Sequence, residues 1–151
     1  VLRPFKVEDA NIFYEITQDK DIKDFVPYAS PDSLEEAVQN IKTYYSKGDF
    51  IHDFYFIIEQ KSTKEIVGAL IVTQNQDGEF DMSLIISRNH RQKGYMKEAV
   101  DAFIQNMPSN SKLVFIVEKK NQASLTLMSH LDVTEVPCRL SKRRKFLHVT
   151  H

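Results

Sequence analysis

The sequence predicts a mixed α/β fold in which helices pack on one sheet, and three observations support it. Apolar residues recur with the period of a strand in some segments and of a helix in others. Asp77-Gly78 separates two apolar runs and predicts a hairpin. A helical pattern over residues 95–107 lies between two predicted strands, as in a crossover that joins a parallel pair.

The composition fits a single domain over residues 1–151. The hydrophobic fraction is 42%, charged residues make up 27%, and the net charge is −1. These values exclude a disordered chain and argue against a dedicated nucleic-acid binder, which carries a basic excess. The longest apolar runs are far shorter than the roughly 20 residues that span a membrane. The single Cys138 forms no intramolecular disulfide, so we expect a cytoplasmic protein without nucleic-acid or membrane partners.

The N-terminal part of the chain predicts a strand followed by a helix. Residues 1–5 form the strand, and residues 7–19 carry apolar side chains at helical spacing. The next segment, residues 20–31, breaks this pattern, with Pro27 and Pro31 on either side of Tyr28.

A second helix is predicted from its first turn. Ser33 and Glu36 have the spacing of a capping box, in which each side chain satisfies a free backbone N–H. Gly48 follows where a left-handed residue would end the helix. The predicted apolar face consists of Leu34, Ala37, Val38, Ile41 and Tyr45.

Three strands then predict an antiparallel meander over residues 54–58, 66–73 and 80–86. Gly68 lies inside the second strand, where a glycine marks a bulge or a close backbone approach. In the third strand apolar residues alternate with Asp81, so its carboxylate points away from the most apolar face.

The C-terminal part of the chain predicts two helices and three strands. Asn121 is a suitable N-cap for the second of these helices. In chain order the predicted elements are a helix over 95–107, a strand over 112–117, a helix from 121 to about 131, and strands over 135–140 and 146–150 joined by a basic turn at 142–145.

The segment around Gly94 carries the most chemical information. A strand ends, a short basic loop follows, and Gly94 begins a helix. The N-terminus of a helix offers free N–H groups and partial positive charge to phosphate oxygens, and Arg91 and Lys93 add full charges. The arrangement suits a pyrophosphate, although it matches neither of the two better-known phosphate loops. The alternative is that Gly94 only starts a helix and that both basic side chains are solvated.

This segment also resembles a known family. Residues 91–99, Arg-Gln-Lys-Gly-Tyr-Met-Lys-Glu-Ala, resemble motif A of the GNAT family of N-acetyltransferases, whose pattern is Arg/Gln-x-x-Gly-x-Gly/Ala. Asn121 to Ser124 is similar to the Asn-x-x-Ser that begins the family's fourth helix, and Leu2-Arg3-Pro4 is similar to its N-terminal opening. Residues 21–45 resemble the RimJ/RimL-like branch, which acetylates the N-terminal amine of ribosomal proteins.

The resemblance implies a fold and a co-substrate. The fold is a mostly antiparallel sheet of six to seven strands, with helices on both faces and one parallel pair splayed at the cofactor site. The co-substrate is acetyl-CoA, and no metal is expected. The residues that would hold its pyrophosphate are Arg91, Gln92, Lys93, Gly94, Tyr95 and Met96, and those that would contact pantetheine are Leu84, Ile85, Ile86, Asn121 and Ser124.

The reaction that the resemblance implies is direct transfer of an acetyl group to a primary amine, with a protein or peptide N-terminus as the expected acceptor. A base must remove the amine proton, and Asp81 matches an acidic position that is frequent on this strand in the family. The alternative for Asp81 is a surface carboxylate beside the hairpin turn. A backbone N–H near Ile86 would polarise the thioester carbonyl. Phe25, Tyr28 and Tyr45 either line an acceptor groove or belong to the core, and we expect a monomer or a homodimer.

Three departures from the family pattern bear on activity. Met96 occupies the second small position of motif A. Met128 stands where many members have a tyrosine as general acid, and a thioether donates no proton. Asp132-Val133 replaces the usual Gly-Phe. Together they leave open a second interpretation, a non-catalytic or weakly active acetyl-CoA-binding sensor or interaction module.

Overall fold

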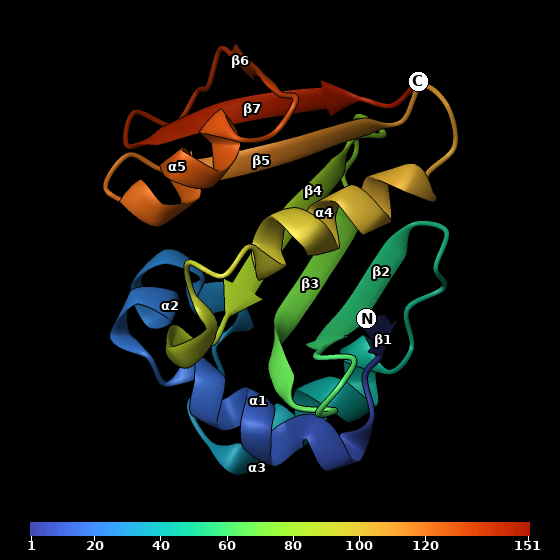
Figure 1. Cartoon of the computed structure of the whole chain (residues 1–151), viewed down its shortest axis with the longest axis vertical. Coiled ribbons are helices and arrows are strands. Elements are labelled where there is room, and N and C mark those ends of the chain that lie inside the picture. The colour runs from blue at the N-terminus through green and yellow to red at the C-terminus, as the bar shows by residue number, and fades with distance from the viewer.

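A seven-stranded sheet lies between two layers of helices in the computed structural model, which describes all 151 residues (Figure 1). The strands are β1 (Leu2–Pro4), β2 (Asp53–Glu59), β3 (Ile66–Gln74), β4 (Phe80–Ile86), β5 (Lys112–Glu118), β6 (Thr134–Val136) and β7 (Arg143–Val149). Their order across the sheet is β1-β2-β3-β4-β5-β7-β6. Neighbouring strands are antiparallel except β4 and β5, which are parallel. The predicted mixed, mostly antiparallel sheet is therefore confirmed.

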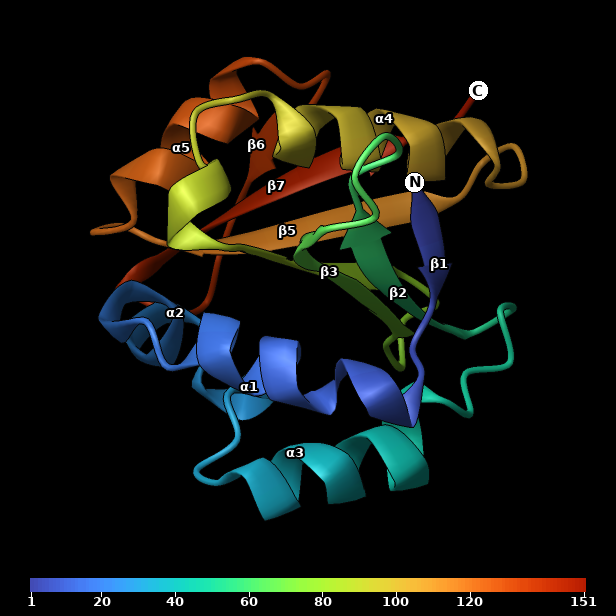
Figure 2. The same ribbon diagram turned by 60° about the horizontal axis from the view of Figure 1, so that its bottom comes forward.

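Helices cover both faces of this sheet, as the resemblance implied. The α-helices are α1 (Ala10–Thr17), α2 (Lys20–Phe25), α3 (Leu34–Asn40), α4 (Tyr95–Gln105) and α5 (Gln122–Ser129). Shorter turns are η1 (Val7–Asp9), η2 (Pro27–Ala29), the π-helical η3 (Ile41–Tyr45) and η4 (Arg88–His90). Figure 2 shows α1 and α3 on one side of the sheet and α4 and α5 on the other. No helix is long and apolar enough to cross a membrane.

The core consists of two clusters, one on each face of the sheet. Strand β4 contributes to both, because its side chains alternate between the faces. Phe80, Met82 and Ile86 belong to the cluster under α4 and α5, whereas Ile85 belongs to the cluster under α1 and α3. Asp81 thus lies on the face opposite the larger cluster, as its alternation predicts.

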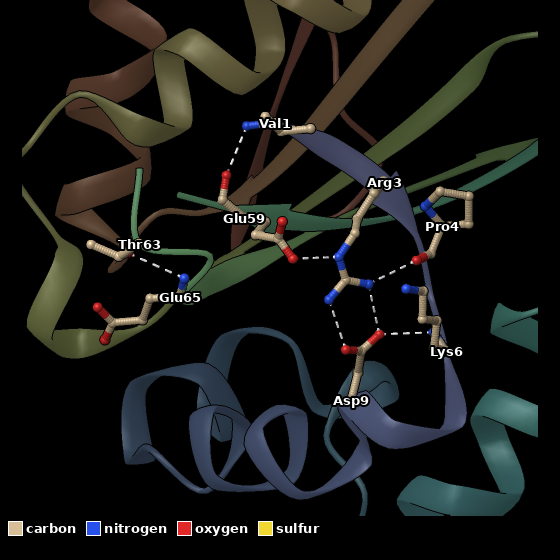
Figure 3. Close-up of polar contacts among 8 residues, drawn as sticks. All are labelled: Val1, Arg3, Pro4, Lys6, Asp9, Glu59, Thr63 and Glu65. Carbon is tan, nitrogen blue, oxygen red and sulfur yellow. Dashed lines mark hydrogen bonds and ion pairs between the residues drawn. The ribbon is translucent and has the colours of Figure 1, made fainter. Parts of the chain in front are cut away.

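Arg3 joins the N-terminal strand to two other segments (Figure 3). Its guanidinium donates two hydrogen bonds to the carboxylate of Asp9 in η1, at 2.8 and 2.9 Å, and one to Glu59 of β2 at 2.6 Å. The Asp9 carboxylate also accepts the backbone N–H of Lys6 at 2.8 Å. Two parallel hydrogen bonds between a guanidinium and a carboxylate fix the relative orientation of the two groups as well as the distance between them. The β1 edge and the start of α1 are therefore held together by one side chain.

Helix α2 lies within residues 20–31, the segment in which the helical pattern of the sequence breaks. The Asp19 side chain accepts the backbone N–H of Asp21 at 2.9 Å and caps the helix. Only Ile22 of its six residues is buried, so the segment lacks the apolar periodicity from which helices are recognised. The capping aspartate was the available signal.

The helix that begins after Ser33 is confirmed, but its end is not as predicted. The Ser33 hydroxyl accepts the N–H of Glu36 at 3.0 Å, whereas the Glu36 carboxylate accepts from Asp32 and not from Ser33. Leu34, predicted on the apolar face, is exposed. Gly48 is not left-handed, because η3 ends the helix before it. A Cβ at Gly48 would lie 2.9 Å from the carbonyl oxygen of Asp53, so close packing against β2 selects this glycine.

The C-terminal hairpin also differs from its prediction. Strand β6 is shorter than residues 135–140 because Pro137 has no N–H to donate. Strand β7 begins three residues before residue 146, so the basic run 142–145 is mostly strand and not a hairpin tip. Its side chains pair with acidic residues of three segments: Arg143 with Glu118 at 2.8 Å, Arg144 with Glu135 at 2.7 Å, and Lys145 with Glu79 at 3.4 Å.

Candidate functional site

The parallel strands β4 and β5 separate soon after they begin. They pair only at Phe80 with Leu113 and at Asp81 with Val114. In Figure 1 they diverge towards the side where α2 and the loop before α4 lie. The N–H of Ser87 donates to β3. Because backbone N–H and C=O groups point alternately to the two sides of a strand, those of Ile86 and Leu84 point away from β3, to the edge of β4 that β5 leaves unpaired. This edge can pair with an extended ligand that carries amide groups.

The loop after β4 presents a row of free donors. The backbone N–H groups of six consecutive residues, Gln92 to Lys97, donate to no protein acceptor. Gly94 is the N-cap of α4, with φ of +82°, and Gln92 is also left-handed at 62°. No atom lies within 4 Å of where a Cβ of Gly94 would be, so the loop is open at this point. Free N–H groups at the N-terminus of an eleven-residue helix are a site for phosphate oxygens.

The basic side chains of the loop are used differently from the sequence prediction. Arg91 lies 3.5 Å from Asp19 and 3.6 Å from Asp21, and it donates to the carbonyl of Ile86 at 3.3 Å. Arg88 donates to Asp19 at 2.6 Å. The Arg88 hydrogen bond lowers the pKa of Asp19 to about 2, although burial opposes it. The acidic residues at the start of α2 therefore hold the loop before α4 in place through its two arginines.

Lys93 is the basic side chain of the loop without an ion pair, and it is exposed. It therefore remains available to an anion at the free N–H groups. Met96, whose bulk departs from motif A, packs against the larger core cluster and comes no closer than 4 Å to where a Cβ of Gly94 would be.

Two contacts fix the loop to the turn between β2 and β3. The Tyr95 hydroxyl accepts a hydrogen bond from the Gln60 amide at 3.1 Å. His90 Nε2 lies 3.3 Å from a carboxylate oxygen of Glu65. The start of α4 is thereby tied to the sheet on one side and to α2 on the other, which keeps its free donors in place.

Asp81 lies where the splay begins and is partly buried. Burial raises the pKa of its carboxyl, and a hydrogen bond from the Asn75 amide at 3.4 Å works in the opposite direction. Two residues further, on the same face, Ser83 shares a 2.6 Å hydrogen bond with the Tyr28 hydroxyl. Tyr28 is 71% exposed and so does not belong to the core. Sequence reasoning did not connect these two residues, which are 55 positions apart.

The other aromatic candidates have structural positions. Tyr45 packs against Phe5, Phe13 and Tyr55, with ring centroids 5.1 to 5.9 Å apart. Burial raises the pKa of Tyr45 to about 12. Phe25 is half-buried at the end of α2. Of the three, Tyr28 alone presents an open ring.

Asn121 and Ser124 lie on the β5 side of the gap between β4 and β5. Asn121 follows β5, and its side chain accepts the N–H of Ser124 at 3.2 Å to cap α5, as predicted. The Ser124 hydroxyl has no protein partner. Met128 is buried in the core cluster, so α5 offers no proton donor at that position.

Comparison with known proteins agrees with this geometry. Residues 1–134 match the family model described as an acetyltransferase (GNAT) domain. No curated protein matches the sequence significantly. Among solved structures, a GNAT acetyltransferase from Bacillus anthracis superposes with a TM-score of 0.82 and 14% identity, over 99% of this chain and 93% of that one.

Two structures from Vibrio cholerae are also similar. A spermidine N-acetyltransferase in complex with CoA and spermine has a TM-score of 0.78 and 14% identity, over 99% of this chain and 95% of that one. A protein provisionally described as a ribosomal-protein-serine acetyltransferase has a TM-score of 0.77 and 17% identity, over 98% and 92%. These identities support the fold. The family model covers most of the sequence, and the chain therefore belongs to the GNAT family of acetyltransferases.

Proposed function

We propose that this chain, a single domain over residues 1–151, transfers the acetyl group of acetyl-CoA directly to the amine of a protein or peptide N-terminus. The observation that carries the proposal is the row of six free N–H groups from Gln92 to Lys97 beside an unpaired strand edge. A pyrophosphate needs several donors at one place, and a pantetheine arm needs a strand edge that accepts amides. Both lie at the same end of β4.

The residues proposed to hold acetyl-CoA fit its two parts. Backbone N–H groups between Gln92 and Met96 take the pyrophosphate, and Lys93 adds charge. Leu84 and Ile86 offer backbone groups to pantetheine, with Ile85 packed beneath them in the core. Asn121 and Ser124 border the arm from the other side of the splay. Arg91 acts on this site through Ile86 and the loop, since its guanidinium faces Asp19 and Asp21.

The chemistry requires a base and a polarised carbonyl. Acetyl-CoA supplies a thioester, whose carbonyl carbon is attacked by the amine nitrogen as the C–S bond breaks. Asp81 accepts the proton of the amine, directly or through water, and its raised pKa suits that task. The N–H of Ile86, turned to the open edge, can donate to the carbonyl oxygen. The thiolate takes its proton from solvent, because Met128 provides none.

Charge near Asp81 favours an acceptor with one positive charge over a polyamine. Three carboxylates lie on this face around the splay: Glu79 pairs with Lys145 and Glu118 pairs with Arg143, whereas Asp81 forms no ion pair and feels the charge of Lys145 only at longer range. One unpaired carboxylate matches one ammonium group. Ile116 lies on the same face of β5 and is 44% exposed, which suits an uncharged chain behind the amine. A peptide N-terminus has this form, and spermidine does not.

Calorimetric titration with acetyl-CoA, followed by turnover assays, tests the proposal. The acceptor panel contains a hexapeptide with a free serine N-terminus, the same peptide acetylated in advance, and spermidine. We expect micromolar binding of acetyl-CoA and turnover of the free peptide. Absence of binding at high micromolar ligand would refute the cofactor assignment. Binding without turnover would favour the non-catalytic sensor, for which the buried Met128 is the supporting observation.

A further inference from the structure

Tyr28 reaches from the helical side of the molecule onto strand β4. Its hydroxyl and the Ser83 hydroxyl are 2.6 Å apart, although most of the Tyr28 side chain is exposed. Ser83 is two residues from Asp81, and side chains two residues apart on a strand share a face. The Tyr28 ring is therefore held near the carboxylate at the opening of the splay.

The segment that carries Tyr28 does not depend on this contact for its position. Ile22 and Ala29, on either side of Tyr28 in the chain, are buried in the core cluster under α1 and α3. The Ser30 hydroxyl also donates to the carbonyl of Val26 at 2.9 Å. An exposed hydrogen bond between two hydroxyl groups adds little to stability. The segment is therefore held without the hydroxyl pair, and what that pair restrains is the phenol ring.

We propose that Tyr28 is an acceptor-binding residue and that Ser83 is its positioning residue. This inference rests on the proposed amine acetylation. An ammonium group bound at Asp81 would lie near this ring, and aromatic faces attract cations. Because Ser83 already restrains the phenol, the Tyr28 side chain loses less rotational freedom on acceptor binding than an unrestrained tyrosine would lose. Both residues act on the acceptor and lie outside the loop of free N–H groups.

Three variants separate the ring from its anchor. Tyr28→Ala removes the ring, Tyr28→Phe removes the hydroxyl, and Ser83→Ala removes the partner. The matched control is Tyr44→Ala, which removes an exposed tyrosine on η3 outside the proposed site. Steady-state kinetics with the free hexapeptide gives KM and kcat. Calorimetry gives the affinity for acetyl-CoA and the affinity of CoA-loaded protein for the peptide without turnover.

We expect Tyr28→Ala to raise the acceptor KM about tenfold, in the range of a lost cation–aromatic contact. Tyr28→Phe and Ser83→Ala should each raise it about threefold, and their combination should add nothing, because both remove the same hydrogen bond. Acetyl-CoA affinity and the Tyr44→Ala control should be unchanged. Peptide binding to CoA-loaded protein should weaken by the same factors.

Other outcomes overturn the inference. Equal peptide affinity of the CoA-loaded wild type and Tyr28→Ala would show that the ring does not contact the acceptor. Additive effects of Tyr28→Phe and Ser83→Ala would show that Ser83 does not act through Tyr28. No turnover by the wild type refutes the proposed function alone, since peptide binding to CoA-loaded protein still compares the variants. If that protein binds neither the peptide nor spermidine, both proposals fail.

Discussion

Asp81 and Val114 form the last residue pair between the parallel strands β4 and β5, which separate beyond them. The carboxylate of Asp81 is therefore placed at the opening of the splay by the sheet itself. Burial raises its pKa, which means that the folded chain disfavours its ionised form. A residue that costs stability in the ionised form is better explained by function than by folding.

Asp81→Asn should stabilise the fold at neutral pH. Because its pKa is higher in the folded than in the unfolded chain, the wild-type carboxyl lowers stability as pH rises through the folded pKa. Below about pH 3.9, the ordinary pKa of aspartate, both states hold the proton and the difference disappears. Urea unfolding of both proteins between pH 4 and pH 8 measures the trend. A variant less stable than wild type at pH 8 would contradict the assignment.

The same substitution should reduce catalysis without reducing cofactor binding. Asparagine retains the shape and the contact with Asn75, but it cannot accept the amine proton. We expect kcat to fall about 100-fold or more at pH 7, as is typical when a general base is lost. Acetyl-CoA affinity, measured by calorimetry, should remain within twofold. A kcat close to that of wild type would assign the base to another group or to water.

Lys93→Glu should weaken acetyl-CoA binding with little effect on the fold. Lys93 is exposed and unpaired, so reversal of its charge breaks no contact, while a carboxylate beside the free N–H groups repels phosphate. We expect about a tenfold rise in Kd at low salt, which should shrink as salt screens the charge. Lys47→Glu, an exposed and unpaired lysine beyond η3, is the control. An equal rise in the acetyl-CoA Kd for the two variants would show that Lys93 does not contribute to the cofactor site.

Asp19→Asn should loosen the loop before α4. The ionised Asp19 accepts from Arg88 and lies near Arg91, so its pKa is lowered to about 2. A lowered pKa means that the stabilising contribution is present above about pH 4 and is lost as pH falls towards 2. We expect lower stability and weaker acetyl-CoA binding than wild type at pH 7, with a smaller stability difference towards pH 3. Asp24→Asn, which alters only an exposed pair with Lys20, should change neither.

Local patterns in the sequence predicted much of the fold and the free N–H groups at the start of α4. Strand β4 has the bounds that its alternation predicts, and Gly78 has the left-handed φ that an Asp-Gly turn requires. Asn121 caps its helix as expected. In each case the signal lies within a few residues of the element that it specifies.

Relationships between distant segments could not be predicted in this way. The pairing of Arg91 with Asp19, and of Tyr28 with Ser83, joins residues that are 72 and 55 positions apart in the chain. The sequence indicated a free cation at Arg91 because no local acid is present. Charge and hydroxyl partners depend on which segments the fold brings together, and a single sequence does not contain that information.

The two glycines closest to the site should respond differently to alanine. Gly94 has φ of +82° with open space around it, so Gly94→Ala should cost about 1–2 kcal/mol for a left-handed alanine, without a clash. A Cβ at Gly68 would overlap the carbonyl oxygen of Ile85 and lie 3.1 Å from the Cα of Ile86, which forces β3 and β4 apart. Gly68→Ala should therefore cost at least about 3 kcal/mol. Urea unfolding compares the two variants, and equal losses would show that β3 and β4 can separate at this point without penalty.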